Sequence, residues 1–111
     1  GKFDGVAMRV PVPSGSLIDF TFLAERPTTV DEIKEIFKEA AEKPEWQGIM
    51  KAVEEPLVST DILGEPYGSI VDLNFIKVIG GDLVKIFSWY DNEWGYCAML
   101  IKHIEALKGY L

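Results

Sequence analysis

The chain contains a single cysteine, Cys97, and a single histidine, His103. One cysteine excludes an internal disulfide, and one cysteine with one histidine cannot close a four-ligand zinc site. No apolar run approaches the roughly 20 residues that span a bilayer, and no apolar segment follows the first residues as a signal peptide requires. These absences argue against a disulfide scaffold, a metal-centred domain and a transmembrane protein, and they fit a reducing compartment.

Basic residues are also scarce. Lysine and arginine number 11 against 18 aspartate and glutamate residues, which gives a formal net charge of -7. Nucleic acid and anionic membranes attract clustered basic side chains, so neither is expected as a partner. The length of 111 residues and the hydrophobic fraction of 48% predict one globular domain over residues 1–111. The chain does not begin with methionine, which fits a processed or excised piece of a longer protein.

The first half of the chain predicts a hairpin followed by a helix. Apolar residues alternate over 6–12 and over 17–25, with a Pro-Ser-Gly-Ser turn between them, so two antiparallel strands are predicted. Thr29 and Glu32 match a capping box, in which the threonine hydroxyl accepts from the Glu32 amide and the Glu32 carboxylate reaches back. Helical spacing of the next apolar residues predicts a helix over 30–42, with Pro44 just beyond its end.

The second half is predicted to be mainly strands before a final helix. Strands are expected over 48–54, 69–79 and 83–90, with a short strand or irregular crossing over 57–63. Gly80 and Gly81 predict a tight turn at positive φ rather than a phosphate loop. Asp91 or Asn92 is expected to cap a helix over 93–108, which ends at Gly109. The fold class is therefore α+β, a mostly antiparallel mixed sheet with two main helices packed on one face.

Two polar residues stand out as candidate binding groups. The Arg9 guanidinium offers a fork that suits phosphate or carboxylate, although the residue spacing taken alone favours pairing with Asp19 or Asp72 on a solvated sheet face. Asn92 lies at the predicted start of a helix. Free N–H groups at a helix start can bind an anion, but Asn92 can also simply cap the helix. The aromatic residues around it, including Tyr96, fit packing in a core or an interface.

Cys97 and His103 do not form a catalytic pair. Six residues at 3.6 per turn place the two side chains on different sides of a helix. A nucleophilic thiol needs a base within reach, so Cys97 is expected to be a small buried hydrophobe and His103 to be solvated. The residues taken alone contain no complete catalytic apparatus and no metal-spaced cluster.

Four segments of the chain resemble consecutive parts of one enzyme family. They are GKFDGVAMRVPVP at residues 1–13, EPLVSTDILG at 55–64, GGDLVK at 80–85 and SWYDNEWGY at 88–96. In this order they resemble the C-terminal part of the catalytic domain of phosphorylating glyceraldehyde-3-phosphate dehydrogenase. The resemblance spans nearly the whole chain.

This resemblance implies roles for three residues. Arg9 matches the arginine that helps to bind the substrate phosphate or the attacking inorganic phosphate. Asn92 matches the asparagine that hydrogen-bonds the nicotinamide carboxamide, and Tyr96 matches the tyrosine beside the nicotinamide ring. The nucleophilic cysteine, the histidine base and the NAD-binding domain of the family would all precede Gly1, so no catalytic residue is expected here. Cys97 follows the Trp-Gly-Tyr motif, where the family has a packing residue.

The resemblance also implies a cellular role. It predicts a fragment of a cytoplasmic glycolytic oxidoreductase that is inactive alone, with NAD or NADP as cofactor of the full-length parent and none expected for this chain by itself. The alternative is a non-catalytic structural or interaction module, natural or engineered, that retains only the fold. Self-association through the sheet face without helices is expected, and so is binding to the remainder of the dehydrogenase if the enzyme is split or processed.

Overall fold

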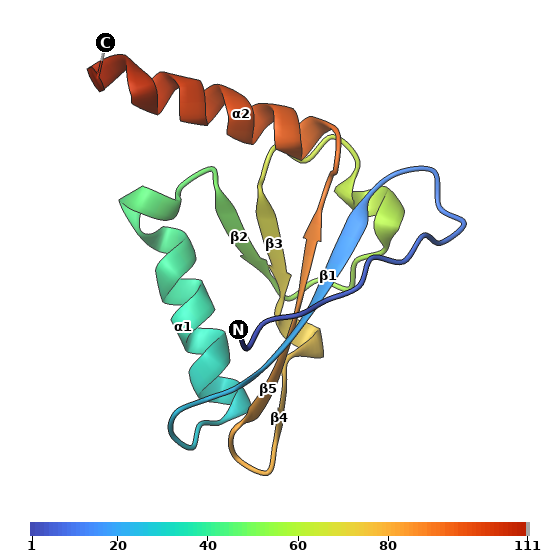
Figure 1. Ribbon diagram of the computed structural model, residues 1–111, viewed down its shortest axis with the longest axis vertical. Helices are drawn as coiled ribbons and strands as arrows, with labels where there is room; N and C mark the ends of the chain where they lie inside the picture. Colours follow the sequence, from blue (N-terminus) through green and yellow to red (C-terminus); the bar gives the residue numbers. More distant parts are fainter. Residues whose placement is uncertain (111) are drawn as a thin grey trace.

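Five strands form a mixed sheet with two α-helices in the computed structural model, which describes residues 1–110 (Figure 1). The strands are β1 (Ser16–Leu23), β2 (Met50–Val53), β3 (Ser69–Asp72), β4 (Lys77–Ile79) and β5 (Leu83–Tyr90), and the helices are α1 (Val30–Glu42) and α2 (Trp94–Leu107). The strand order is β1-β5-β3-β2, with β4 also paired to β5. Only β2 and β3 pair in parallel, which confirms the predicted class of a mostly antiparallel mixed sheet.

Strand β5 is the centre of the sheet and positions the segment that follows it. It pairs antiparallel with β1 from Leu83 to Tyr90, and β3 and β4 pair with its other edge. Gly80 and Gly81 have φ values of 63° and 89° in the turn between β4 and β5, as predicted. The chain therefore leaves β5 at one end of the sheet, where residues 91–93 lead into α2.

The main core lies between α1 and one face of the sheet. Val84 in β5 is fully buried, and Val71 in β3 is 2% exposed. Half-buried side chains of α1 pack against this cluster, among them Val30, Ile33 and Phe37. Their helical spacing gives α1 the apolar face that burial requires, so α1 covers this face of the sheet.

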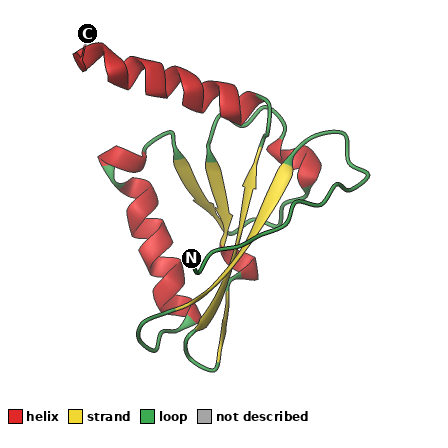
Figure 2. Cartoon of the chain, in the orientation of Figure 1, coloured by secondary structure: helices red, strands yellow, loops and turns green. Residues whose placement is uncertain are grey.

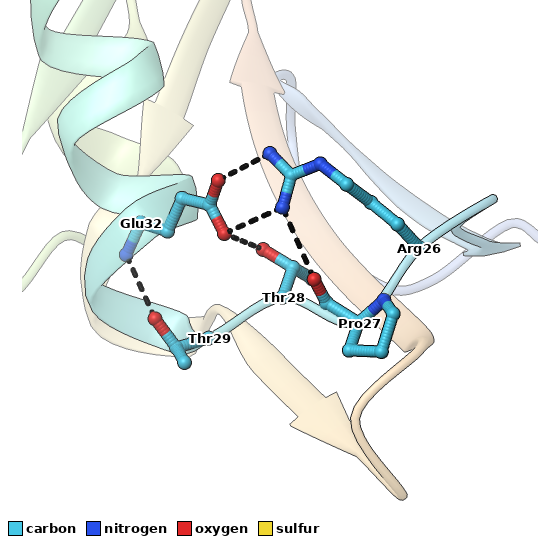
Figure 3. Close-up of polar contacts among 5 residues, drawn as sticks. All are labelled: Arg26, Pro27, Thr28, Thr29 and Glu32. Carbon is cyan, nitrogen blue, oxygen red and sulfur yellow. Dashed lines mark hydrogen bonds and ion pairs between the residues drawn. The ribbon is translucent and has the colours of Figure 1, made fainter.

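The start of α1 confirms one half of the predicted capping box and corrects the other. Thr29 Oγ1 accepts a hydrogen bond from Glu32 N at 3.2 Å (Figure 3). The Glu32 carboxylate does not reach back to Thr29. It instead pairs with the Arg26 guanidinium through both oxygens and accepts from Thr28 Oγ1 at 2.7 Å. Arg26 precedes the helix by only a few residues, so its cation competes successfully for this carboxylate.

The predicted strand over residues 6–12 is absent, and the hairpin prediction was wrong. Residues 1–15 hold no strand, and Val6 and Met8 are almost fully exposed. Pro11 and Pro13 lack the N–H groups that a ladder needs. The Gly15 N–H donates to the Asn92 side chain and is therefore not available to a strand partner. The N-terminal segment therefore crosses the sheet (Figure 1) without pairing to β1.

The predicted strand over 69–79 is interrupted by a 3-10 turn, Leu73–Phe75, between β3 and β4. The cause is Asp72, which is fully buried rather than on an open sheet face. Its carboxylate accepts from Asn74 N at 3.1 Å and from Trp89 Nε1 at 3.1 Å. Asn74 Nδ2 also donates to Glu54 O at 2.8 Å. These side-chain bonds compete with the ladder and turn the chain.

Helix α2 lies across the end of the sheet (Figure 2) and not beside α1, so the prediction of both helices on one face was wrong for α2. Gly95 is its only buried residue. The helical spacing of the apolar residues in 94–104, among them Trp94 and Ile101, forms an apolar stripe that is exposed, with Trp94 at 63% and Ile101 at 58%. Gly109 does not end the helix at positive φ, because the chain continues as a 3-10 turn, Lys108–Tyr110.

Candidate functional site

The junction between β5 and α2 is built around the buried carboxylate of Asp91, which is 4% exposed. Asp91 Oδ1 accepts from Glu93 N and Trp94 N, both at 2.8 Å, and Oδ2 accepts from Gly64 N at 2.9 Å. The bond from Gly64 holds the pKa of Asp91 below its ordinary value, the bonds from Glu93 and Trp94 add to this, and burial opposes them. Asp91 therefore caps α2, as predicted for Asp91 or Asn92, and also fastens the helix start to a distant loop.

Asn92 follows directly and has a partner far away in the sequence. Its Oδ1 accepts from the backbone N–H of Gly15 at 3.0 Å. The Asn92 residue is exposed. The side chain thus lies at the surface of the junction and is held by the end of the N-terminal segment.

Tyr96 lies in the first turn of α2 and is 64% exposed. It shares this turn with Gly95, whose backbone packs closely against the carbonyl of Tyr67. Asn92 and Tyr96 are therefore brought to one end of one helix, as the sequence motif predicts.

Arg9 lies in the exposed N-terminal segment and is not part of a strand. The pairings considered for it do not form. Asp19 Oδ2 pairs instead with Lys85 Nζ at 2.7 Å, and Asp72 is buried among its own partners. The connection between this segment and the helix start is the Gly15–Asn92 hydrogen bond.

Two hollows of the described surface lie away from these residues. One, of about 300 Å³, lies between the end of α1 and β2 and is lined by residues that include Lys38, Lys51 and Tyr67. The other, of about 160 Å³, is lined by residues that include Leu57 and Asp61. Neither is lined by Arg9, Asn92 or Tyr96, so the binding roles of those three residues stay predictions.

The single thiol is placed differently from the prediction. Cys97 is exposed on α2, not buried, because α2 does not pack its apolar stripe on the sheet. His103 is exposed, as predicted. Among residues 1–110 no three side chains of histidine, cysteine, aspartate or glutamate gather as metal ligands. The search of the same residues finds no helix that is long and apolar enough to cross a membrane.

Sequence reasoning missed two features of this site. The first is the tie from Asp91 to Gly64, and the second is the tie from Asn92 to Gly15. Both glycines have positive φ, 82° at Gly64 and 88° at Gly15. A glycine beside other turn residues indicates a position with positive φ. The sequence does not show, however, which side chain accepts a hydrogen bond from the backbone N–H of that glycine.

Comparison with known proteins gives a consistent result. Residues 1–92 match the protein family described as "Glyceraldehyde 3-phosphate dehydrogenase, C-terminal domain". The chain is 43% identical over 101 residues to a glyceraldehyde-3-phosphate dehydrogenase of Zymomonas mobilis, covering 91% of this chain and 30% of that protein. It is 48% identical over 107 residues to glyceraldehyde-3-phosphate dehydrogenase 2 of a Nostoc species, covering 96% of this chain and 32% of that protein. The chain thus spans about a third of the length of the curated relatives it matches.

Proposed function

Because the chain belongs to the glyceraldehyde 3-phosphate dehydrogenase C-terminal domain family, we propose that it forms part of the substrate and cofactor wall of a phosphorylating dehydrogenase. The observation that supports this most strongly is the family match over residues 1–92, which includes both Arg9 and Asn92. In this proposal Arg9 binds a phosphate group, Asn92 binds the nicotinamide carboxamide, and Tyr96 packs beside the nicotinamide ring.

The chemistry of the helix start fits a nicotinamide ring. The Asn92 amide offers a hydrogen-bond donor at the surface, and the exposed ring of Tyr96 in the same helix turn offers an apolar face. NAD or NADP, when bound in the complete enzyme, accepts a hydride from the substrate. In this proposal the residues of this chain bind and orient the substrate and the cofactor. The guanidinium of Arg9 suits a phosphate group, and the amide of Asn92 suits the carboxamide.

We propose further that the 111-residue chain is inactive alone. Acyl transfer through a thioester needs a thiolate with a base in reach. The sequence has one cysteine and one histidine. Both are exposed on α2, and their spacing of six residues places them on different sides of the helix. The purified chain should therefore form no NADH from glyceraldehyde 3-phosphate, phosphate and NAD⁺. NADH production above a no-enzyme blank would refute this.

Complementation tests the positive side of the proposal. The chain is mixed with a fragment of the Zymomonas mobilis relative that lacks the matching third, and NADH formation is followed by absorbance. We expect activity that depends on both parts. Arg9→Ala should raise the KM for phosphate, whereas Arg26→Ala, which removes the same charge beside Glu32, should leave that KM unchanged. Equal phosphate KM values for the two variants would contradict the role of Arg9.

Self-association is proposed from the sheet face opposite α1. Phe75 and Phe87 pack edge to face there with centroids 5.8 Å apart, and Phe75 remains 48% exposed. Lys85 and Asp19 form an ion pair on the same face. Because such an apolar centre with polar neighbours is typical of interfaces, we expect a dimer or larger oligomer. Light scattering that reports a monomer at hundreds of micromolar would contradict it.

A further inference from the structure

The hydrogen bond between Gly15 and Asn92 fixes which half of the Asn92 amide faces outward. A backbone N–H can only donate, so the atom that it meets at 3.0 Å must be the carbonyl oxygen Oδ1. The NH₂ group then lies on the other branch of the amide. Within residues 1–110 the Asn92 side chain makes no second hydrogen bond, so both donors of Nδ2 remain free for a ligand.

Gly15 also lies close to a second segment, which begins at Ser59. Its φ is +88°, and a Cβ at this position would lie 3.2 Å from the carbonyl oxygen of Ser59. Ser59 begins the 3-10 helix Ser59–Ile62, and Gly64 just beyond that helix donates to Asp91. Asp91 thus bonds to Gly64 just beyond this short helix, and Asn92 bonds to Gly15, which lies near its first residue. A turned-over Asn92 amide would point its NH₂ group at the Gly15 N–H, so that two donors would face each other, which favours the observed orientation.

We propose that Gly15 is a positioning residue for Asn92, which holds the amide so that only its NH₂ group faces the nicotinamide carboxamide. The inference rests on the proposed function, because that function supplies the ligand. A donor-only amide recognises the carbonyl oxygen of the carboxamide and ignores the carboxamide NH₂. Binding of the dinucleotide should therefore depend on the carbonyl oxygen of the carboxamide group and not on the NH₂ of that group.

The first experiment tests the positioning contact on the 111-residue chain without ligand. Asn92→Asp keeps an oxygen for the Gly15 N–H, whereas Asn92→Leu removes the acceptor. Hydrogen exchange of the Gly15 amide, measured by NMR, should be slow in the wild type and in Asn92→Asp and at least about tenfold faster in Asn92→Leu. Equal exchange rates in all three proteins would overturn the proposal.

The second experiment tests what the amide recognises. The 111-residue protein is first combined with the Zymomonas mobilis fragment used for complementation. NAD⁺ and 3-acetylpyridine adenine dinucleotide, which keeps the carbonyl group attached to the ring but has a methyl group in place of the NH₂, are then titrated separately into this complex while the Asn92 NH₂ signals are followed by NMR. We expect shifts with both, at Kd values within about twofold of each other. If the amide faced the ligand through Oδ1, the acetyl compound would lose a hydrogen bond and bind about tenfold more weakly, which would overturn the proposal.

Gly15→Ala tests the positioning residue without altering Asn92. The added Cβ meets the Ser59 carbonyl and the backbone is strained at φ +88°, so the N–H should move away from Asn92. We expect about tenfold weaker binding of both dinucleotides, with the circular dichroism spectrum unchanged. Gly5→Ala, at a position with no atom within 4 Å, is the control and should bind as the wild type does. Wild-type affinity in Gly15→Ala would overturn the proposal.

The outcomes separate this inference from the function on which it rests. If no protein responds to NAD⁺, the cofactor role of Asn92 is wrong, and the role of Gly15 falls with it. If the wild type responds but Gly15→Ala responds equally, only the positioning role is wrong.

Discussion

Gly95 should tolerate no side chain, although it lies in a helix. A Cβ at this position would lie 2.7 Å from the carbonyl oxygen of Tyr67 and 3.4 Å from that of Glu65. Both contacts are with backbone, which cannot rotate away as a side chain can. Gly95→Ala must therefore push the first turn of α2, with Tyr96 on it, away from the end of the sheet.

The magnitude follows from two opposing effects. Alanine is favoured over glycine in a helix by about 0.5–1 kcal/mol, so an unhindered site would gain stability. Overpacking at a rigid contact costs about 1–3 kcal/mol. The central values of these two ranges differ by about 1 kcal/mol, so we expect Gly95→Ala to lower the free energy of unfolding by about that amount. The sign alone is informative, because helix propensity predicts the opposite change.

Urea unfolding followed by tryptophan fluorescence measures the effect. Gly109→Ala is the control, because a Cβ there meets no atom within 4 Å, and it should leave stability unchanged or slightly raised. Gly68→Ala should cost less than Gly95→Ala, since its Cβ would meet the flexible end of the Met99 side chain at 2.9 Å. A Gly95→Ala protein as stable as the wild type would refute the proposed seating of α2.

Three further predictions concern buried and titrating groups. The Asp91 carboxylate accepts from three backbone N–H groups, and in Asp91→Asn the new NH₂ group would face at least one of these donors. The substitution should therefore lower the unfolding free energy at pH 7 by about 1.5–3 kcal/mol. An unchanged urea midpoint would contradict this. The hydrogen bonds from Arg26 and then Thr28 lower the pKa of Glu32 from 4.5 to about 2, so its stabilisation is present above pH 4.5 and is lost as the pH falls toward 2. Glu32→Gln should flatten the stability curve in that range, and a curve parallel to the wild type would exclude the effect. Val84→Ala empties a fully buried position and should cost about 2 kcal/mol in the same assay, more than any substitution at an exposed valine.

The elements that the sequence predicted best are those specified locally. Helix α1 has the predicted bounds, 30–42, because Thr29 caps it and the apolar spacing runs to its end. Strand β5 has the predicted bounds, 83–90, because paired glycines precede it and a polar junction follows it. Each of these signals lies within a few residues of the boundary that it sets.

The elements that were mispredicted depend on distant partners. Alternation over residues 6–12 is typical of a strand, but it does not show whether an edge is available to pair with. The break in 69–79 depends on Asp72 meeting Trp89, and the sequence pattern cannot show that pair. The apolar stripe of α2 indicates a buried face, yet α2 approaches the sheet end through the backbone of its own Gly95, beside the Tyr67 carbonyl, and through the Met99 side chain, beside Gly68.

The candidate site divides in the same way. Asn92 and Tyr96 were singled out because they belong to one short motif that resembles the family's, and the structure places both at the start of α2; their binding roles stay predictions. Gly15 was not found, because its contact with Asn92 joins positions 77 residues apart. The carboxylate of Asp91 was identified as a cap, but its third donor, Gly64, comes from a separate loop.

The seating of α2 on main-chain atoms has a practical consequence. A helix that is located by its backbone does not depend on its outward side chains for its position, so changes there should leave the direction of its axis unaltered. Cys97, the sole thiol, is exposed on this helix. A fluorophore or spin label attached there would record how the domain meets other molecules while the neighbouring turn keeps its geometry.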